Sequence, residues 1–264
     1  MTAVADGGAI DLDGRVALVT GGASGIGRAT CEVLGRCGAA VAVVDRDGDG
    51  ARRSAEALHR DGVRALAVAA DVRDEVAVDE ATRRCVTELG GVDILVNNAG
   101  GTFVVPTVDL TAKGFDTLIS ENLRSAFLCS RAVAHAVREL GRPAAIVNVG
   151  SCAGEVAAPG CMAYGAAKAG MISMTRTLSL EWAPYGIRVN CVAPDFIDTE
   201  GARDLLPESR REALRRAIPL GRMGDAAEVA WVIAFLASGL AGYVTGQTVD
   251  VDGGTRVGGR SLAF

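Results

Sequence analysis

The chain has 264 residues, which is long enough for one large domain or two small ones around a substantial core. Hydrophobic residues make up 49% and charged residues 22%, a composition that excludes an intrinsically disordered chain. The formal net charge is -5 and no block of basic residues interrupts it. The sequence therefore predicts no nucleic-acid partner and no membrane partner, and favours a small neutral or cationic ligand.

The seven cysteines form no C-x-x-C pair, and most lie in apolar stretches, which is typical of reduced thiols in a cytoplasmic protein. The two histidines, His59 and His135, stand far apart, so we expect neither a metal site nor a histidine-based triad. Residues 1–14 carry acids and no apolar core, and the longest apolar run, 229–237, is about half of a membrane span. The sequence predicts a soluble, cytoplasmic protein.

From residue 15 onward, short β-rich runs alternate with longer helical patterns, and no linker or repeat marks a domain boundary. The runs are almost continuously apolar, as expected of parallel strands covered on both faces. We therefore expect one α/β domain over residues 1–264, with a core at about 12–254 and a doubly wound sheet of about seven parallel strands flanked by helices. The predicted strands are residues 15–20, 41–45, 64–70, 92–97, 144–150, 187–192 and 247–252.

The first predicted strand runs into the segment TGGASGIG, residues 20–27, and then into a helical pattern. Gly21, Gly25 and Gly27 allow the backbone to turn tightly and approach a pyrophosphate, whose charge the N-terminus of the following helix stabilises. Because strand, turn and helix follow one another as this mechanism requires, the segment predicts a dinucleotide-binding turn.

Asp45 ends the second predicted strand, 24 residues after Gly21, where an acid that binds the adenosine ribose is expected. A carboxylate accepts hydrogen bonds from ribose hydroxyls and repels a 2′-phosphate, so Asp45 favours NAD over NADP. Arg46 keeps NADP open, because a guanidinium pairs with such a phosphate. A turn aspartate at the end of a strand is the alternative interpretation of Asp45.

Ser151 follows the fifth predicted strand, at the edge of a doubly wound sheet where ligands bind. Tyr164 and Lys168 lie four residues apart in a predicted helix over 162–182, so they share one face. A neighbouring ammonium and an oxidised nicotinamide ring would lower the pKa of the phenol from about 10. Tyr164 would then be the general base for an alcohol or the general acid for a ketone, while Ser151 holds the substrate oxygen.

Together these motifs resemble the short-chain dehydrogenase/reductase family, in its single-domain subfamily with a Rossmann fold, over about residues 12–254. The resemblance implies an NAD(P)-dependent enzyme that transfers a hydride between nicotinamide and a secondary alcohol or ketone. It also implies a catalytic tetrad of Asn122, Ser151, Tyr164 and Lys168, in which the asparagine holds a water that relays protons to the lysine. The matching segments are TGGASGIG at 20–27, NNAG at 97–100, SENLRSAF at 120–127, YGAAK at 164–168, YGIRVNCVAP at 185–194 and YVTGQTVDVDGG at 243–254.

The resemblance extends to the residues that contact the cofactor and the substrate. The cofactor-binding residues it implies are Gly21, Ser24, Gly25, Ile26, Gly27, Asp45, Arg46, Asp71, Val72, Asn98, Ala99, Gly100, Tyr164, Lys168, Pro194, Ile197 and Thr199. The candidate substrate contacts are Phe103, Cys152, Glu155, Asp195 and Phe196. Residues 204–223 have the charged, amphipathic pattern of a helical lid, which an ordinary surface helix shares.

One position departs from the family pattern, which usually has Pro-Gly where this chain has Pro194 and Asp195. We hypothesise that Asp195 lines the substrate pocket and favours a polyhydroxylated or cationic substrate. A solvated aspartate in a turn is the alternative.

Two other functions share these motifs. A 3-oxoacyl carrier-protein reductase that uses NADPH is disfavoured by Asp45 and by the negative net charge, which opposes docking of an acidic carrier protein. A non-catalytic nucleotide-binding regulator is disfavoured by the complete tetrad. The helical stretches 123–137 and 171–182 have more apolar positions than one sheet-facing stripe needs, which together with the resemblance predicts a homotetramer. The expected partner is a small alcohol or ketone.

Overall fold

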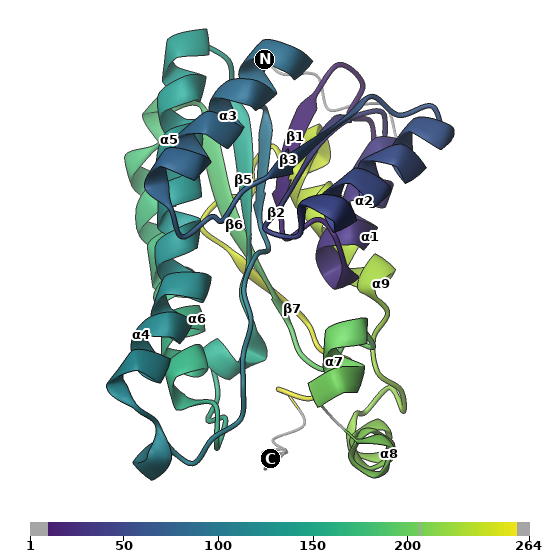
Figure 1. Ribbon diagram of the computed structural model, residues 1–264, viewed down its shortest axis with the longest axis vertical. Helices are drawn as coiled ribbons and strands as arrows, with labels where there is room; N and C mark the ends of the chain where they lie inside the picture. The colour runs from purple at the N-terminus through teal and green to yellow at the C-terminus, as the bar shows by residue number, and fades with distance from the viewer. Residues whose placement is uncertain (1–9, 206, 258–264) are drawn as a thin grey trace.

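The computed structural model describes residues 10–205 and 207–257. In this part of the chain, seven strands form one parallel sheet in the order β3-β2-β1-β4-β5-β6-β7 (Figure 1). From β1 the strands are added toward one edge of the sheet as far as β3, and from β4 they are added toward the other edge. The point between β1 and β4 where this order reverses is where ligands bind in a doubly wound fold. The strands are β1 Val16–Thr20, β2 Ala40–Asp45, β3 Ala65–Ala69, β4 Ile94–Asn97, β5 Ala144–Val149, β6 Ile187–Pro194 and β7 Thr248–Val251.

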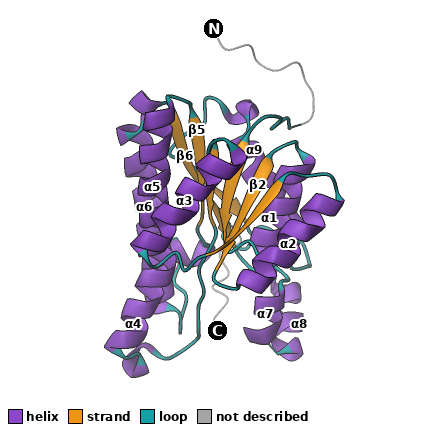
Figure 2. Cartoon of the chain, turned by 45° about the horizontal axis from the view of Figure 1, so that its top comes forward, coloured by secondary structure: helices purple, strands orange, loops and turns teal. Residues whose placement is uncertain are grey.

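Helices cover both faces of the sheet (Figure 2). The buried side chains of α1, α2 and α9 pack on one face, and those of α3, α5 and α6 pack on the other. The helices are α1 Gly25–Arg36, α2 Gly48–Arg60, α3 Glu75–Leu89, α4 Ala112–Ile119, α5 Ser125–Leu140, α6 Met162–Glu181, α7 Glu200–Leu205, α8 Glu208–Ala217 and α9 Ala226–Ala237. None of these helices is both long and apolar enough to cross a membrane.

The strand β1 shows why the apolar runs are continuous. Ala17 and Val19 point to the layer of α1 and α9, whereas Val16 and Leu18 point to the layer of α3 and α5. All four side chains are buried, because successive residues of a strand face opposite sides of a sheet that is covered twice. Burial of each valine or leucine contributes about 1.5–3 kcal/mol to folding. The predicted α/β fold with a doubly wound parallel sheet is confirmed.

The segment predicted as a helical lid, 204–223, contains the end of α7 and the whole of α8. Pro207 is the N-cap of α8, and its extended ψ of 154° together with its missing N–H prevents the two helices from joining into one. Leu206 lies outside the described residues. In Figure 1, α7 and α8 lie below the carboxyl ends of the strands.

Candidate active site

The glycine-rich turn leads from β1 into α1. Gly21 and Gly25 have φ angles of +66° and +52°, in the left-handed region that favours glycine. A Cβ atom on Gly27 would lie 2.0 Å from the carbonyl oxygen of Gly21, so a side chain cannot be accommodated there. The backbone therefore forms a tight cradle at the N-terminus of α1, where the first N–H groups and the helix dipole favour a phosphate.

Hydrogen bonds across β1 and β4 hold this cradle in place. The Thr20 hydroxyl donates to Val96 O at 3.2 Å and accepts from the backbone N–H groups of Asn98 and Ala99, each at 3.0 Å. The Asn98 amide donates to Thr20 O at 3.0 Å and to Gly21 O at 3.1 Å. Asn98 and Ala99, the residues of the NNAG motif that directly follow β4, therefore fix the turn after β1. This turn lies at the point where the strand order of the sheet reverses.

Asp45 ends β2 beside the cradle. Its Oδ2 accepts a hydrogen bond from Ala23 N at 3.1 Å, and its Oδ1 accepts one from Asp47 N at 3.0 Å. These bonds orient the carboxylate along a cleft of about 340 Å³ that Gly21 and Arg46 also line. We call this space the adenosine cleft.

Three more charged side chains line the adenosine cleft: Asp71, Arg73 and Glu121. Arg73 donates to both oxygens of Asp71, at 2.6 Å for the shorter bond, and this hydrogen bonding lowers the pKa of the Asp71 carboxyl. Glu121 Oε1 lies 3.2 Å from Nη1 of Arg73 and 3.5 Å from Nη1 of Arg46. Glu121 is therefore shared between two arginines.

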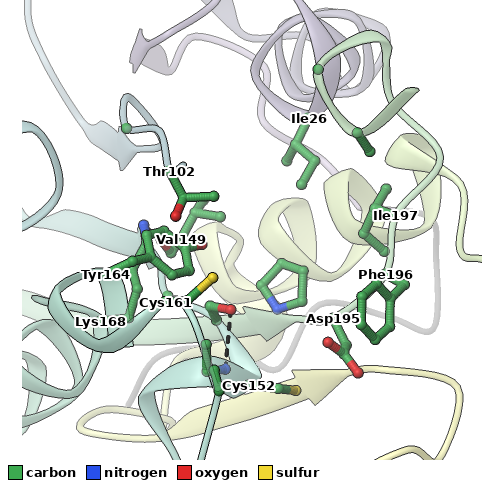
Figure 3. Close-up of a pocket in the computed structure, with 18 of the residues that line it drawn as sticks. Ile26, Thr102, Val149, Cys152, Cys161, Tyr164, Lys168, Asp195, Phe196 and Ile197 are labelled. Atoms are coloured by element: carbon green, nitrogen blue, oxygen red, sulfur yellow. Dashed lines mark hydrogen bonds between the residues drawn. The ribbon is translucent and has the colours of Figure 1, made fainter. Parts of the chain in front are cut away.

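A second space, a cavity of about 840 Å³, continues from the adenosine cleft. Both spaces are lined by Ile26, Asn98, Gly100 and Thr199, so one ligand can extend through both. In Figure 3, Tyr164 and Lys168 lie on one side of this cavity, and Asp195 and Phe196 lie on the other. We call it the substrate cavity.

Tyr164 and Ser151 meet in the substrate cavity. Tyr164 comes from the first turn of α6, and Ser151 caps the short 3-10 helix Cys152–Gly154, where its Oγ accepts from Ala153 N at 3.2 Å. Burial raises the pKa of Tyr164 to about 12, and hydrogen bonding with Ser151 opposes this rise. Burial is therefore the largest effect on the phenol here, and the lowering of its pKa by the ammonium together with an oxidised nicotinamide ring stays a prediction.

Lys168 lies one helical turn after Tyr164. Its Nζ is 5.5 Å from the centre of the Tyr164 ring and donates a hydrogen bond to Val149 O at 2.8 Å, at the end of β5. Burial lowers the pKa of this lysine to about 8. The ammonium is thus charged at neutral pH and fixed in direction by a backbone carbonyl.

Asn122 lies in a π-helical segment, Ser120–Arg124, between α4 and α5. Its Nδ2 donates to Leu118 O and Gly101 O, each at 2.9 Å, so that the side chain points inward. Its Oδ1 is buried and accepts no hydrogen bond from any described residue. A Cβ atom on Gly100 would lie 2.4 Å from this oxygen and 3.7 Å from Lys168 Nζ, which places the asparagine oxygen and the lysine on one side of Gly100.

The structure places most of the predicted site residues in these two spaces. Gly27 shapes the cradle without lining either space. The predicted residues that line the substrate cavity are Ile26, Asn98, Gly100, Asn122, Ser151, Cys152, Tyr164, Lys168, Pro194, Asp195, Phe196, Ile197 and Thr199. Those that line the adenosine cleft alone are Gly21, Ser24, Gly25, Asp45, Arg46, Asp71, Val72 and Ala99.

Two predicted substrate contacts, Phe103 and Glu155, do not line the cavity. Phe103 is 40% exposed, and its ring lies 3.4 Å from the position that a Cβ of Gly114 would take, so it packs against α4. Glu155 pairs with Arg256, which itself lines the cavity. Neither side chain forms part of the cavity wall, because the resemblance places the loops but not the directions of their side chains, and contact with a substrate stays a prediction for both.

The polar residues that line the two spaces and were not predicted include Arg73, Glu121, Thr255 and Arg256. A signal for them was present in the sequence. Arg73 and Glu121 are close neighbours of predicted residues, and Thr255 and Arg256 directly follow the last predicted strand. In a parallel sheet, that strand ends at the same edge as the strands before Ser151 and Asp195.

A glycine cradle, a carboxylate beside it and a serine, tyrosine, lysine and asparagine around one cavity define a dinucleotide-binding oxidoreductase site at the reversal point of a parallel sheet. A family model described as enoyl-(acyl carrier protein) reductase matches residues 21–256. The chain belongs to the short-chain dehydrogenase/reductase family, whose members are oxidoreductases that use a nicotinamide cofactor.

Known relatives span almost the whole chain. The chain is 42% identical over 245 residues to the 3-oxoacyl-[acyl-carrier-protein] reductase FabG of Pseudomonas aeruginosa, covering 93% of this chain and 98% of the relative. It is 38% identical over 243 residues to a D-threitol dehydrogenase of Mycolicibacterium smegmatis, covering 92% and 93%. A solved 7α-hydroxysteroid dehydrogenase, in complex with NADH and 7-oxo glycochenodeoxycholic acid, aligns with a TM-score of 0.89 at 30% identity, covering 93% and 95%.

Proposed function

We propose that the protein is an NAD-dependent oxidoreductase that transfers a hydride between nicotinamide and a secondary alcohol or its ketone. The observation that carries this proposal is the convergence of Ser151, Tyr164 and Lys168 on a cavity continuous with the glycine cradle. The related hydroxysteroid dehydrogenase, which is similar in fold, binds NADH together with a ketone. A hydride acceptor and a proton-transferring phenol in one continuous space are what this reaction requires.

The residues present fit a nicotinamide dinucleotide. The cradle around Gly21 and Gly27 leaves no room for a Cβ and suits a pyrophosphate, while Asp45 suits the adenosine ribose. Lys168 would hold the second ribose. When bound in its oxidised form, the cofactor supplies a carbon that accepts the hydride and a positive charge near the phenol.

Tyr164 moves the proton in this proposal. With a pKa raised to about 12, the phenol is protonated at neutral pH and is ready to donate to the oxygen of a ketone. Ser151 donates a hydrogen bond to the same oxygen and fixes the carbon that reacts. In the oxidative direction, Lys168 stabilises the phenolate, and the buried Oδ1 of Asn122 accepts from a water that carries protons to the lysine.

The preference for NAD rests on Asp45 and Glu121. The Asp45 carboxylate is held in place by two backbone N–H groups and would repel a 2′-phosphate. Arg46, the residue that would favour such a phosphate, already faces Glu121. An NADPH-dependent 3-oxoacyl carrier-protein reductase is the second candidate, which the 42% identity to the Pseudomonas enzyme favours.

Turnover of secondary alcohols by the wild type and by Tyr164→Phe tests the proposal. With NAD⁺, we expect the variant to lose about 10²–10⁴-fold in kcat, because the proton-transferring group is gone. Its affinity for NADH, measured by fluorescence titration, should stay within about threefold. Full turnover in the variant would refute the assigned chemistry, and tenfold better kcat/KM with NADPH and an acyl carrier substrate would favour the second candidate.

We further propose that the protein is a cytoplasmic homotetramer. Phe127 on α5 and Leu180 on α6 are 43% and 77% exposed, and Trp231 and Phe235 on α9 are 45% and 39% exposed. Two helical surfaces with large apolar side chains are typical of faces covered by other copies of a chain. Light scattering tests this proposal, and the mass of a monomer at micromolar concentration would contradict it.

A further inference from the structure

The wall of the substrate cavity on the side of β6 and β7 carries three polar side chains. Asp195 directly follows β6, and Thr255 and Arg256 come shortly after β7. The two strands pair side by side, with Pro194 opposite Val251, so the three side chains meet at one place. Figure 3 shows Asp195 on the side of the cavity away from Tyr164. A ligand whose reacting oxygen lies at Tyr164 can therefore reach this wall with a more distant group.

Asp195 is fixed through one of its two carboxylate oxygens. The Thr255 hydroxyl lies 2.6 Å from Oδ2, which accepts its hydrogen bond, and the backbone N–H of Asp195 donates to Val251 O at 3.3 Å. No hydrogen bond from another described residue reaches Oδ1. Because a carboxylate oxygen in a half-buried position is a strong acceptor, it favours a ligand that donates a hydrogen bond.

Arg256 adds hydrogen-bond donors to the wall without making it positive. Its guanidinium pairs with Glu155, and its Nη1 lies 2.7 Å from Asp250 Oδ2. Asp252 accepts hydrogen bonds from the backbone N–H of Arg256 at 2.8 Å and is close to Thr255. Burial raises the pKa of the Asp195 carboxyl, and burial together with Glu155 raises that of Asp250 to about 6. The Arg256 guanidinium is thus shared between Glu155 and Asp250, and with Asp195 and Asp252 beside Thr255 the acids outnumber the arginine at this end of the cavity.

The chemistry of this wall discriminates between classes of alcohol. A hydroxy acid would bring its carboxylate against Asp195, while the arginine that could bind it is already paired. A monohydric apolar alcohol would displace water from Asp195 Oδ1 and offer no donor in return. The ammonium of an amino alcohol donates to Asp195 but has no lone pair that accepts a hydrogen bond from Arg256. A ligand with several hydroxyls donates to Asp195 and accepts from Arg256 at once.

We infer that the substrate cavity takes a polyhydroxylated secondary alcohol, or the hydroxyketone formed from it, with a hydroxyl beyond the reacting carbon donating to Asp195. This inference rests on the proposed function and deepens it by naming the class of substrate. The carbon chain would lie against the apolar remainder of the wall, which includes Val156, Phe196 and Met223. Asp195 is then the residue that determines specificity, and it takes no part in proton transfer.

Paired substrates test the inference. We would measure kcat/KM with NAD⁺ for polyols of four to six carbons and for monohydric secondary alcohols of equal carbon number, using the wild type, Asp195→Asn and Asp204→Asn. The wild type should prefer the polyols by at least about 100-fold. Asp195→Asn should lower kcat/KM for the polyols about 10- to 100-fold, mainly through KM, and change that for monohydric alcohols less than threefold.

Asp204 is the matched control, because it is an acid that lines the same cavity from α7 but is exposed. Asp204→Asn should leave the preference for polyols unchanged. An equal loss in both variants would show a general effect of charge and overturn the role of Asp195. The same polyol preference in Asp195→Asn as in the wild type would overturn it as well.

The other substrate classes complete the test. A wild type that oxidises monohydric alcohols, amino alcohols or hydroxy acids better than polyols overturns the inference and leaves the proposed hydride transfer standing. A wild type that binds NADH but oxidises none of these classes with either cofactor overturns both. The failure of the inference and the failure of the proposed function therefore give different results.

Discussion

The adenosine cleft is shaped by backbone, whereas the substrate cavity is shaped by side chains. Around the cleft, the left-handed glycines, the contact between Gly27 and Gly21 and the bonds of Thr20 and Asn98 leave the chain one conformation. Around the cavity, residues from segments far apart in the sequence supply the wall, and their size and charge decide what fits. A substitution in the cleft should therefore disturb binding of any dinucleotide, and one in the cavity should change which substrate is preferred.

The two regions also differ in how they affect the stability of the fold. The hydrogen bonds of the cleft join β1 to β4 and support the sheet, whereas Lys168 buries an ammonium that water would solvate better. A pKa lowered from 10.5 to about 8 corresponds to an unfavourable contribution on the order of 3 kcal/mol at neutral pH. Lys168 thus supports activity and lowers stability, whereas the hydrogen bonds of the cradle support both.

Replacement of Lys168 by Met should have the largest effect and would sharpen this contrast. We expect kcat to fall about 10²–10⁴-fold, because the group that stabilises the phenolate is lost. At pH 7 we expect the free energy of unfolding, measured with urea, to rise by about 3 kcal/mol, because the buried charge is removed.

The pH dependence of this gain follows from the direction of the shift. The folded pKa of Lys168 lies below its unfolded value, so between about pH 8 and pH 10.5 the unfolded wild type binds more protons than the folded one. The advantage of Lys168→Met is complete below pH 8 and disappears as the pH rises to 10.5. Lys113→Met changes the only other lysine, which is exposed, and should alter neither quantity. A variant at Lys168 that is less stable than the wild type at pH 7 would contradict the cost of its burial.

Replacement of Gly27 by Ala tests the cradle. The added Cβ would lie 2.0 Å from Gly21 O and 2.5 Å from Nδ2 of Asn98, so the turn must move. We expect NADH to bind about 100-fold more weakly in fluorescence titrations, and the preference among alcohol substrates at saturating cofactor to stay unchanged.

Gly201→Ala is the control for this variant. Gly201 lines both spaces from α7, and a Cβ there meets no atom within 4 Å. NADH affinity within about twofold of the wild type is expected, and circular dichroism reports whether each variant is folded. If a folded Gly27→Ala variant binds NADH as tightly as Gly201→Ala, the cleft is not determined by its backbone.

The difference between the cleft, which is shaped by backbone, and the cavity, which is shaped by side chains, explains which parts of the site the sequence predicts. The cleft follows from local patterns, because Gly21, Gly25, Gly27 and Asp45 lie within 25 consecutive residues of one strand, turn, helix and strand. The cavity wall depends on the pairing of strands that are far apart in the sequence. Thr255 is 60 residues after Asp195 and reaches it only because β6 and β7 are neighbours in the sheet.

Local sequence patterns also do not show how deeply a side chain is buried. The spacing of Tyr164 and Lys168 predicts that they share one side of α6, and the structure places both in one cavity. The spacing does not reveal how much protein surrounds the phenol, and this burial raises the Tyr164 pKa where the lysine alone would lower it. In the same way, the sequence places Glu155 near the site but does not show that it pairs with Arg256.

Replacement of Glu121 by Gln should have the smallest effect, because it changes a side chain that lines the cleft and leaves the cradle backbone unchanged. Glu121 Oε1 faces Arg46 at 3.5 Å, and Arg46 is 70% exposed, so the pair contributes only about 0.2–1 kcal/mol. Neutralising Glu121 leaves Arg46 available to a 2′-phosphate, while Asp45 still opposes that phosphate. We therefore expect the ratio of kcat/KM with NADP⁺ to that with NAD⁺ to rise about two- to fivefold, and to return to the wild-type value in Glu121→Gln combined with Arg46→Ala. A rise that persists in the double variant would show that Glu121 acts on the cofactor directly, and a fall would show that Arg46 does not face the phosphate.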